Sequence, residues 1–125
     1  MTKPPPMMVK RLPEHCDQAS RRSFLREIKE FVDSSHRPRL IVDLSAAGQI
    51  SPASIDLLME CVGHAARADG EVSVSGASPE TGVILEVTQA ASVLNMFPSV
   101  LEAANDRPLH DSESWKQAYP QHRAA

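Results

Sequence analysis

Hydroxyl and carboxylate side chains lie close together between Asp43 and Ser54, where an apolar run ends and a helical pattern begins. The start of a helix has backbone N–H groups without intrahelical partners and the positive end of the helix dipole, so it favours an anion or a phosphorylated hydroxyl. The carboxyl end of a parallel strand is also where open α/β sheets bind their ligands. The simpler interpretation is that Ser51 and Ser78, each followed by proline, only cap helices and that Ser54 only completes a first turn.

No pattern of residues indicates catalysis. The five histidines are dispersed, and none has metal-ligand spacing to cysteine or to a carboxylate. Cys61 and His64 are three residues apart on one expected helix, but a single such pair does not make a zinc site. The motifs G-x-S-x-G, G-x-G-x-x-G and G-x-x-x-x-G-K-[ST] are absent from the sequence. We therefore expect no enzyme, no metal and no cofactor.

The elements that would position these side chains alternate between strands and helices. Apolar runs predict four strands, which are Met7–Leu12, Leu40–Ser45, Val72–Val74 and Val93–Phe97. Helical periodicity and capping residues predict helices that begin near Asp17 or Ser20, at Ser51-Pro52, at Ser78-Pro79 and at Pro98. This alternation predicts an α/β fold with a sheet of about four or five mostly parallel strands and helices packed on it.

The expected inner faces of the two central helices follow from their apolar residues. The helix after Ser51-Pro52 should bury Ile55, Leu58, Met59, Val62, Ala65 and Ala66 and stop at Gly70. The helix after Ser78-Pro79 should bury Val83, Ile84, Val87 and Thr88.

Length and composition restrict the class of protein. The 125 residues, 42% of them hydrophobic and only 4% aromatic, predict one domain with an aliphatic core. A net charge of −3 without a basic stripe makes nucleic acid an unfavourable partner. Two separated cysteines, no signal-peptide pattern and no membrane span indicate a cytoplasmic protein. We expect a flexible Pro-rich lead at residues 1–6, a domain at 7–105, and a tail at 106–125 that packs loosely or forms one polar helix.

Several stretches follow one another in a characteristic order and spacing. They are Leu12–Asp17 before the first helix, Arg39–Ser45 ending in Asp-Leu-Ser, Ile50–Leu58 opening the next helix, Gly70–Gly76 with Ser78–Glu80, and Leu94–Pro98. From about Val9 to Asn105 the chain resembles the STAS domain of bacterial anti-sigma factor antagonists. The resemblance implies a non-enzymatic domain that binds another protein, and it adds Asp17 to the site as the counterpart of a family acidic residue. The family's extra N-terminal strand has no recognisable counterpart here.

The chain departs from the family at the residue that carries the family's best-known chemistry. In the family, a partner kinase phosphorylates the second serine of an Ile-Asp-Ser-Ser-Gly stretch, and phosphorylation ends binding. That position is Ala53 here, while Ser51, Pro52 and Ser54 occupy the places of the acid, the first serine and the glycine. Alanine has no hydroxyl, so a phosphate, which adds about −1.5 to −2 charge, has no acceptor there. Binding is then constitutive, or Ser54 or Ser51 serves as the phosphorylated residue instead.

Three hypotheses follow, and a homodimer remains open under each. The first is a STAS-like interaction module whose partner is an anti-sigma factor or a histidine-kinase-like serine kinase. Its expected partner-binding residues are Asp17, Asp43, Ser45, Ser51, Pro52, Ala53, Ser54 and Ile55. The second is an accessory subunit of a transporter or of a larger signalling assembly. The third is a small enzyme or ligand carrier that uses a crevice near Asp17, Asp43 and Ser54.

Overall fold

The computed structural model describes residues 6–47 and 49–105. The strands are β1 (Met7–Arg11), β2 (Arg39–Asp43), β3 (Glu71–Ser75) and β4 (Asn95–Phe97). The helices are α1 (Gln18–Asp33), α2 (Pro52–Arg67), α3 (Pro79–Val87), the short 3-10 helix η1 (Ala90–Ser92) and α4 (Val100–Asn105). The expected lead, apart from Pro6, and the expected tail of residues 106–125 lie outside the described residues, and the domain boundaries remain a prediction.

The four strands form one sheet in the order β1-β2-β3-β4, and every neighbouring pair is parallel. The predicted α/β fold class is therefore confirmed. The run Arg39–Val42 is buried throughout because β2 is a central strand with helices over both of its faces. Since parallel strands end at the same edge, the loops after β1, β2 and β3 begin side by side there.

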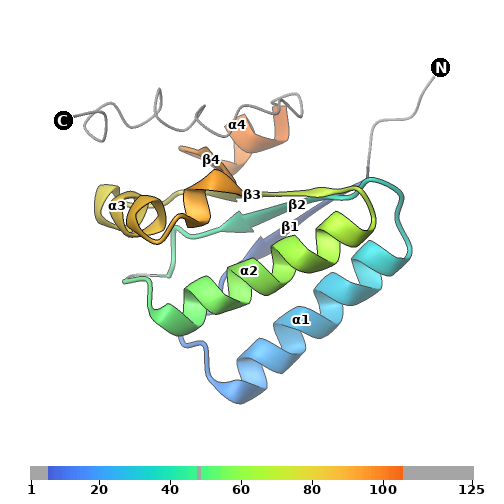
Figure 1. Cartoon of the computed structure of the whole chain (residues 1–125), viewed down its shortest axis with the longest axis horizontal. Coiled ribbons are helices and arrows are strands. Elements are labelled where there is room, and N and C mark those ends of the chain that lie inside the picture. The colour runs from blue at the N-terminus through green and yellow to red at the C-terminus, as the bar shows by residue number, and fades with distance from the viewer. Residues whose placement is uncertain (1–5, 48, 106–125) are drawn as a thin grey trace.

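Helices cover the two faces of the sheet unequally (Figure 1). The side chains at alternate strand positions, including Leu40, Val42, Val72 and Val74, join the main core on the side of α1 and α2. On the other face, α4 contacts β2, β3 and β4. Arg39 holds it there, because its guanidinium donates a hydrogen bond of 2.9 Å to the Ala103 carbonyl near the end of α4.

The predicted inner face of α2 is partly wrong. In α1, Phe24, Ile28 and Val32 are buried. The buried residues of α2 are Ser54, Leu57, Leu58, Cys61 and Ala65. Ala66, expected inside, is exposed, and Ile55, Met59 and Val62 lie at the border of the core. The buried face of α2 is therefore rotated about the helix axis relative to the predicted stripe, and Leu57 and Cys61 lie at its centre.

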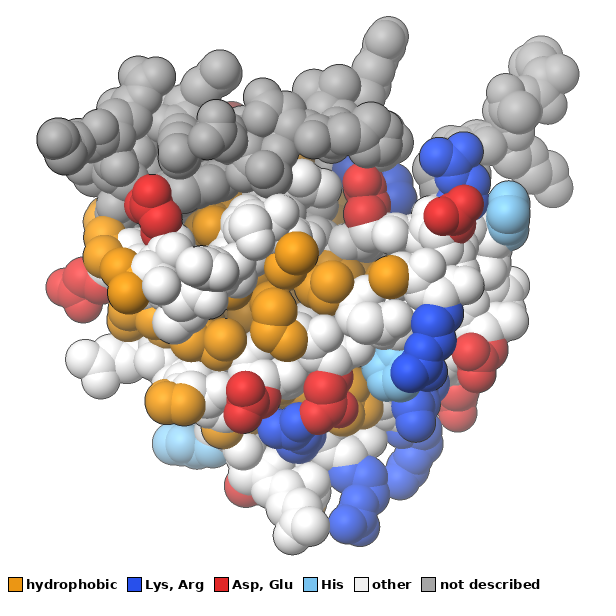
Figure 2. Space-filling view, in the orientation of Figure 1, with side chains coloured by type: hydrophobic (Ala, Val, Ile, Leu, Met, Phe, Trp, Pro, Cys, Tyr) orange, Lys and Arg blue, Asp and Glu red, His pale blue; other side chains and the backbone are white. Residues whose placement is uncertain are grey.

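The predicted inner face of α3 is wrong. Thr81, Gly82 and Leu85 are its buried residues. Val83, Ile84 and Val87, which we expected inside, are 44%, 37% and 76% exposed, and Thr88 is also exposed. The helix is apolar on nearly all sides, so its composition does not determine which side faces the core. Figure 2 shows the resulting hydrophobic surface over α3 and the segment that follows it.

The sequence predicted that Gly70 stops α2, but Gly70 has a different role in the structure. Asp69 adopts the left-handed conformation with φ 61°, and the Gly70 N–H donates to the Ala65 carbonyl at 2.8 Å, as in a Schellman motif. Gly70 itself lies against Pro38, and a Cβ atom there would come within 2.7 Å of the proline ring carbons. Gly70 is therefore required for close packing between the loop before β2 and the loop before β3.

Candidate functional site

The start of α2 forms the centre of the expected site. Ser51 has extended backbone dihedrals and caps the helix, since its hydroxyl accepts a hydrogen bond of 3.2 Å from the Ser54 N–H. Pro52 follows at the first helical position, where a backbone N–H would have no partner within the helix, so its absence costs no hydrogen bond. The predicted helix start at Ser51-Pro52 is confirmed, and α3 begins in the same way with Ser78 as its cap.

The side chain of Ser54 points into the protein. It is only 6% exposed, and its Oγ lies 3.0 Å from the Ser51 Oγ and 3.4 Å from the Cys16 Sγ. Cys16 belongs to the loop between β1 and α1, so this loop packs directly on the first turn of α2. The hydroxyl of Ser54 therefore links two segments of the chain and is not presented at the surface.

Asp17, next to Cys16, is the cap of α1. Its Oδ1 accepts a hydrogen bond of 2.7 Å from the Ser20 N–H, and this bond is the main reason why the pKa of the carboxyl is lower than usual. The carboxylate is exposed and stays ionised at neutral pH. Asp17 thus contributes a fixed negative charge in the segment that lies against the start of α2.

Asp43 ends β2 and organises the turn that follows. Its Oδ1 accepts a hydrogen bond of 2.9 Å from the Ser45 N–H, while the Leu44 N–H donates to the Ser75 carbonyl at 2.8 Å. Gly76, with φ 72°, passes so close that an added Cβ would lie 3.2 Å from the Asp43 Oδ1. The carboxylate therefore has a structural partner, and the next turn of the chain closes over it.

The surface around the start of α2 consists of small and polar side chains. Ser45, Ala46, Gln49 and Pro52 are exposed, and Ala53 is half-buried beside them. Ile55 is also half-buried and packs against the core. We call the segment from Ser45 to Ile55, without Gly48, the α2 mouth; Asp17 and Cys16 border it.

The predicted site residues are thus brought to one edge of the sheet, but their reactive groups do not converge. Asp17, Asp43 and Ser54 each bond to a different part of the backbone or to a different side chain. Within residues 6–47 and 49–105, no group of three or more His, Cys, Asp or Glu side chains is arranged to hold a metal ion. The α2 mouth consequently offers shape, backbone groups and charge for binding another molecule.

Cys61 and His64 do not form a reactive pair. Cys61 is fully buried in the core, and burial raises the pKa of its thiol to about 12. Partial burial, together with the nearby Lys29 and Arg67 charges, lowers the pKa of His64 below its usual value. Cys61 is thus a core side chain, as a free cysteine in an apolar run usually is.

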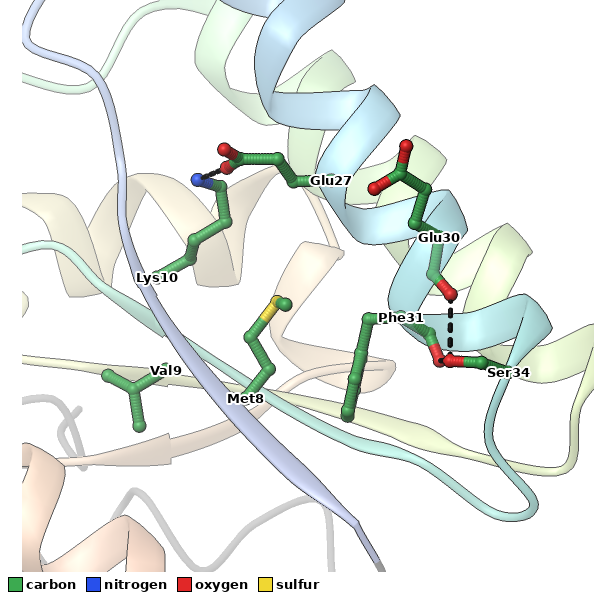
Figure 3. A pocket seen from close by; sticks show the side chains of 7 residues that line it. All are labelled: Met8, Val9, Lys10, Glu27, Glu30, Phe31 and Ser34. Atoms are coloured by element: carbon green, nitrogen blue, oxygen red, sulfur yellow. Dashed lines mark hydrogen bonds and ion pairs between the residues drawn. The ribbon is translucent and has the colours of Figure 1, made fainter.

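The sequence did not reveal two features of the molecule. One is the contact of Cys16 with Ser54, for which the only signal was the position of Cys16 beside Asp17. The other is an open groove of about 540 Å³ between β1 and α1 (Figure 3). Its lining residues are Met8, Val9, Lys10, Glu27, Glu30, Phe31 and Ser34.

Comparison with models of protein families identifies the family that the fold and the motifs indicate. The sequence model of the STAS domain matches residues 1–103. The chain belongs to the STAS domain family. The suspected resemblance is thereby confirmed, whereas no curated protein matches the chain.

Solved structures agree with this membership in fold. An anti-sigma-factor antagonist (STAS) domain protein from Planctomyces limnophilus superposes with a TM-score of 0.61 at 15% identity, over 74% of this chain and 83% of that one. A candidate anti-sigma factor antagonist from Thermotoga maritima gives a TM-score of 0.63 at 14% identity, over 78% of this chain and 84% of that one. At such low identity the likeness concerns the fold alone.

A search for membrane-spanning helices gives a negative result for the described part of the chain. No helix there is both long enough and apolar enough to cross a bilayer.

Proposed function

We propose that this STAS domain is a cytoplasmic interaction module that regulates transcription by binding an anti-sigma factor or a histidine-kinase-like serine kinase. The observation that carries the proposal is the α2 mouth, an exposed helix start at the carboxyl edge of the sheet whose polar groups are bonded internally. Such a surface recognises a partner by shape, free backbone groups and charge. We propose that the domain binds without catalysing a reaction.

The proposed contact surface consists of the α2 mouth and the exposed side of α2. Ser45 and Pro52 are exposed, while Ala53 and Ile55 lie half-buried between them. Asp17, which caps α1 next to Cys16, and Asp43, at the end of β2, add carboxylates to this surface. Burial of the Ser54 hydroxyl fixes the first turn of α2, so the surface is already ordered before a partner binds.

We further propose that binding does not depend on the serine switch of the family. Ala53 has no hydroxyl at the usual position. Ser54 is 6% exposed and bonded to two side chains, so a kinase would reach it only after the helix start opened. Ser51 is more accessible, but its hydroxyl is the cap of α2, and a phosphate there would replace that hydrogen bond. Both alternative acceptors are therefore disfavoured, and we expect constitutive binding.

An affinity purification from native lysate tests the proposal. The full chain should retain a kinase-like or anti-sigma protein, identified by mass spectrometry. Ala53→Asp places a negative charge at the second position of α2, where the helix dipole tolerates it, so the variant should fold but lose the partner. The matched control is Leu101→Asp, which places the same charge at the second position of α4 on a 69% exposed side chain. It should retain the partner.

Two outcomes would count against the proposal. If the wild-type chain retained no kinase-like or sigma-regulating protein, the partner class would be wrong. If both aspartate variants retained the partner equally well, the partner would bind elsewhere on the domain. Mass analysis of the purified chain from the same lysate tests the absence of a switch, since a phosphate on Ser51 or Ser54 would contradict constitutive binding.

One observation favours a second function, that of an accessory subunit of a transporter or a larger signalling assembly. Val83, Ile84 and Val87 form an exposed apolar face on α3, in addition to the α2 mouth. Contiguous exposed apolar side chains often mark a second protein contact. Genes for a permease and an ATPase next to this gene would support the second function, whereas genes for a kinase and a sigma factor would support the first.

A further inference from the structure

We propose that β1 joins two copies of this chain. The β1 strands of the two copies would pair antiparallel about a two-fold axis at Val9, and the two four-stranded sheets would become one. This contact uses residues outside the α2 mouth, so it is independent of the proposed function.

Among residues 6–47 and 49–105, no strand pairs with the outer side of β1, so its backbone presents hydrogen-bonding groups at the edge of the sheet. The Pro6 carbonyl accepts from the Arg39 N–H at 2.8 Å, and the Leu12 N–H donates to the Asp43 carbonyl at 2.9 Å. Because strand residues alternate in direction, the even-numbered residues of β1 bond to β2 and the odd-numbered residues point away from it. The outward groups therefore belong to Met7, Val9 and Arg11.

These outward groups determine how two copies would fit together. They are arranged symmetrically about Val9, so a two-fold axis there places Val9 opposite Val9 of the second copy and Met7 opposite Arg11 of the second copy. Each of these is a hydrogen-bonded pair of an antiparallel ladder, in which both residues exchange N–H···O bonds. A shift by one residue would leave the outward groups without partners. Among the registers that set outward groups opposite each other, the one with its axis at Val9 pairs all three outward residues of β1.

Apolar side chains on one face of β1 would be covered by the contact. Met7 and Val9 are 44% and 46% exposed, although they belong to the sheet. Both lie on the face that α4 covers over β2, β3 and β4. Cross-strand pairing would bring the two Val9 side chains together and shield part of this apolar surface from water.

Charged side chains lie on the other face of β1, where the groove between β1 and α1 opens. There, Lys10 forms an ion pair with Glu27, and the Glu30 carboxylate, which also belongs to the groove, points away from Met8 (Figure 3). In the proposed pairing, Lys10 of the second copy stands directly opposite Met8, and each Lys10 keeps the ion pair with Glu27 of its own copy. In this register no two like charges stand directly opposite each other.

The usual devices that prevent edge pairing are weak in β1. Proteins often protect an edge strand with lysine, proline or a bulge. No proline lies between Met7 and Arg11, and all five residues pair with β2 in an unbroken register. Lys10 is directed toward α1, where it contacts Glu27 and lies 5.1 Å from the centre of the Phe24 ring. Its charge therefore does not block the edge.

Sedimentation velocity of the full chain over a range of concentrations tests the contact. Because two five-residue strands bury little area, we expect a weak, concentration-dependent dimer. Val9→Pro removes the outward N–H without removing a bond to β2, and Val9→Lys places two like charges opposite each other. Each should raise the dissociation constant of the dimer by at least about tenfold. Val87→Lys, a change at a valine 76% exposed on α3, should leave it unchanged.

A cross-link at the axis provides a second measurement. The Cα atoms of a hydrogen-bonded antiparallel pair are about 5.5 Å apart, within the range that a disulfide spans. Val9→Cys should therefore give a disulfide-linked dimer under mild oxidation, whereas Val87→Cys should not. A wild-type chain that stays monomeric at every concentration, or a dimer that persists in both Val9 variants, would overturn the proposal. Dimerisation lost only in Val87→Lys would assign the contact to α3 instead.

Discussion

Removal of the Ser51 hydroxyl should weaken α2 at its first turn. In Ser51→Ala, the buried N–H of Ser54 loses its acceptor at 3.2 Å, and the Ser54 hydroxyl loses its neighbour at 3.0 Å. Loss of a helix cap typically costs about 1 kcal/mol, and a buried hydroxyl that keeps only one weak thiol partner can add about 1 kcal/mol more. We therefore expect the free energy of unfolding to fall by about 1–2 kcal/mol.

Urea denaturation followed by circular dichroism measures this change, and Ser78→Ala is the matched control. Ser78 caps α3 in the same way, with the Thr81 N–H and the Thr81 hydroxyl each 3.1 Å from its Oγ. The two variants should lose similar stability. Only Ser51→Ala should also speed the reaction of Cys16 with a thiol reagent, because Cys16 packs against the first turn of α2.

A double-mutant cycle with Ser54→Ala separates the stability lost with the helix cap from the stability lost with the contact between the two hydroxyls. If the hydroxyls of Ser51 and Ser54 interact as their distance indicates, the double variant should be more stable than the sum of the single changes predicts, by about 0.5–1 kcal/mol. A loss below about 0.3 kcal/mol in Ser51→Ala would refute the capping argument. An unchanged rate at Cys16 in that variant would refute the coupling between the two loops.

Two further predictions concern the thiols and the glycines. In the native chain a thiol reagent should modify Cys16 alone, because burial raises the pKa of Cys61 to about 12. Denaturation should make the Cys61 thiol reactive as well. Rapid modification of both thiols in the native state would contradict the buried position of Cys61. Gly70→Ala should lower the free energy of unfolding, measured by urea denaturation, by about 1–3 kcal/mol, because its Cβ would clash with Pro38. Gly63 in α2 has open space around it, so Gly63→Ala should be neutral or stabilising. Equal effects of the two alanines would contradict this packing.

Residues whose roles depend on close sequence neighbours were predicted correctly. Asp17, Ser51 and Ser78 each cap a helix by accepting from the N–H three residues ahead, which is a local interaction. The apolar run of β2 likewise showed a strand covered on both faces. Such signals determined the order of the elements, and that order was sufficient to predict a parallel α/β sheet.

The orientation of α3 could not be predicted in the same way. A helix with apolar residues on most sides can bury several alternative faces. The chain connects α3 between β3 and η1, and this connection turns Thr81, Gly82 and Leu85 inward and leaves Val83 and Val87 in water. The exposed apolar face is therefore a result of tertiary packing.

For this protein, the sequence alone determined the helix starts, the buried strands, membership of the STAS pattern and the missing hydroxyl at Ala53. Only the tertiary structure decided that the Ser54 side chain is buried against Cys16, 38 residues away, and that β1 lies at the edge of the described sheet. The physical reason is distance along the chain. Caps and periodicity act within one or two turns, whereas contacts between loops and the position of an edge arise only when the strands pair.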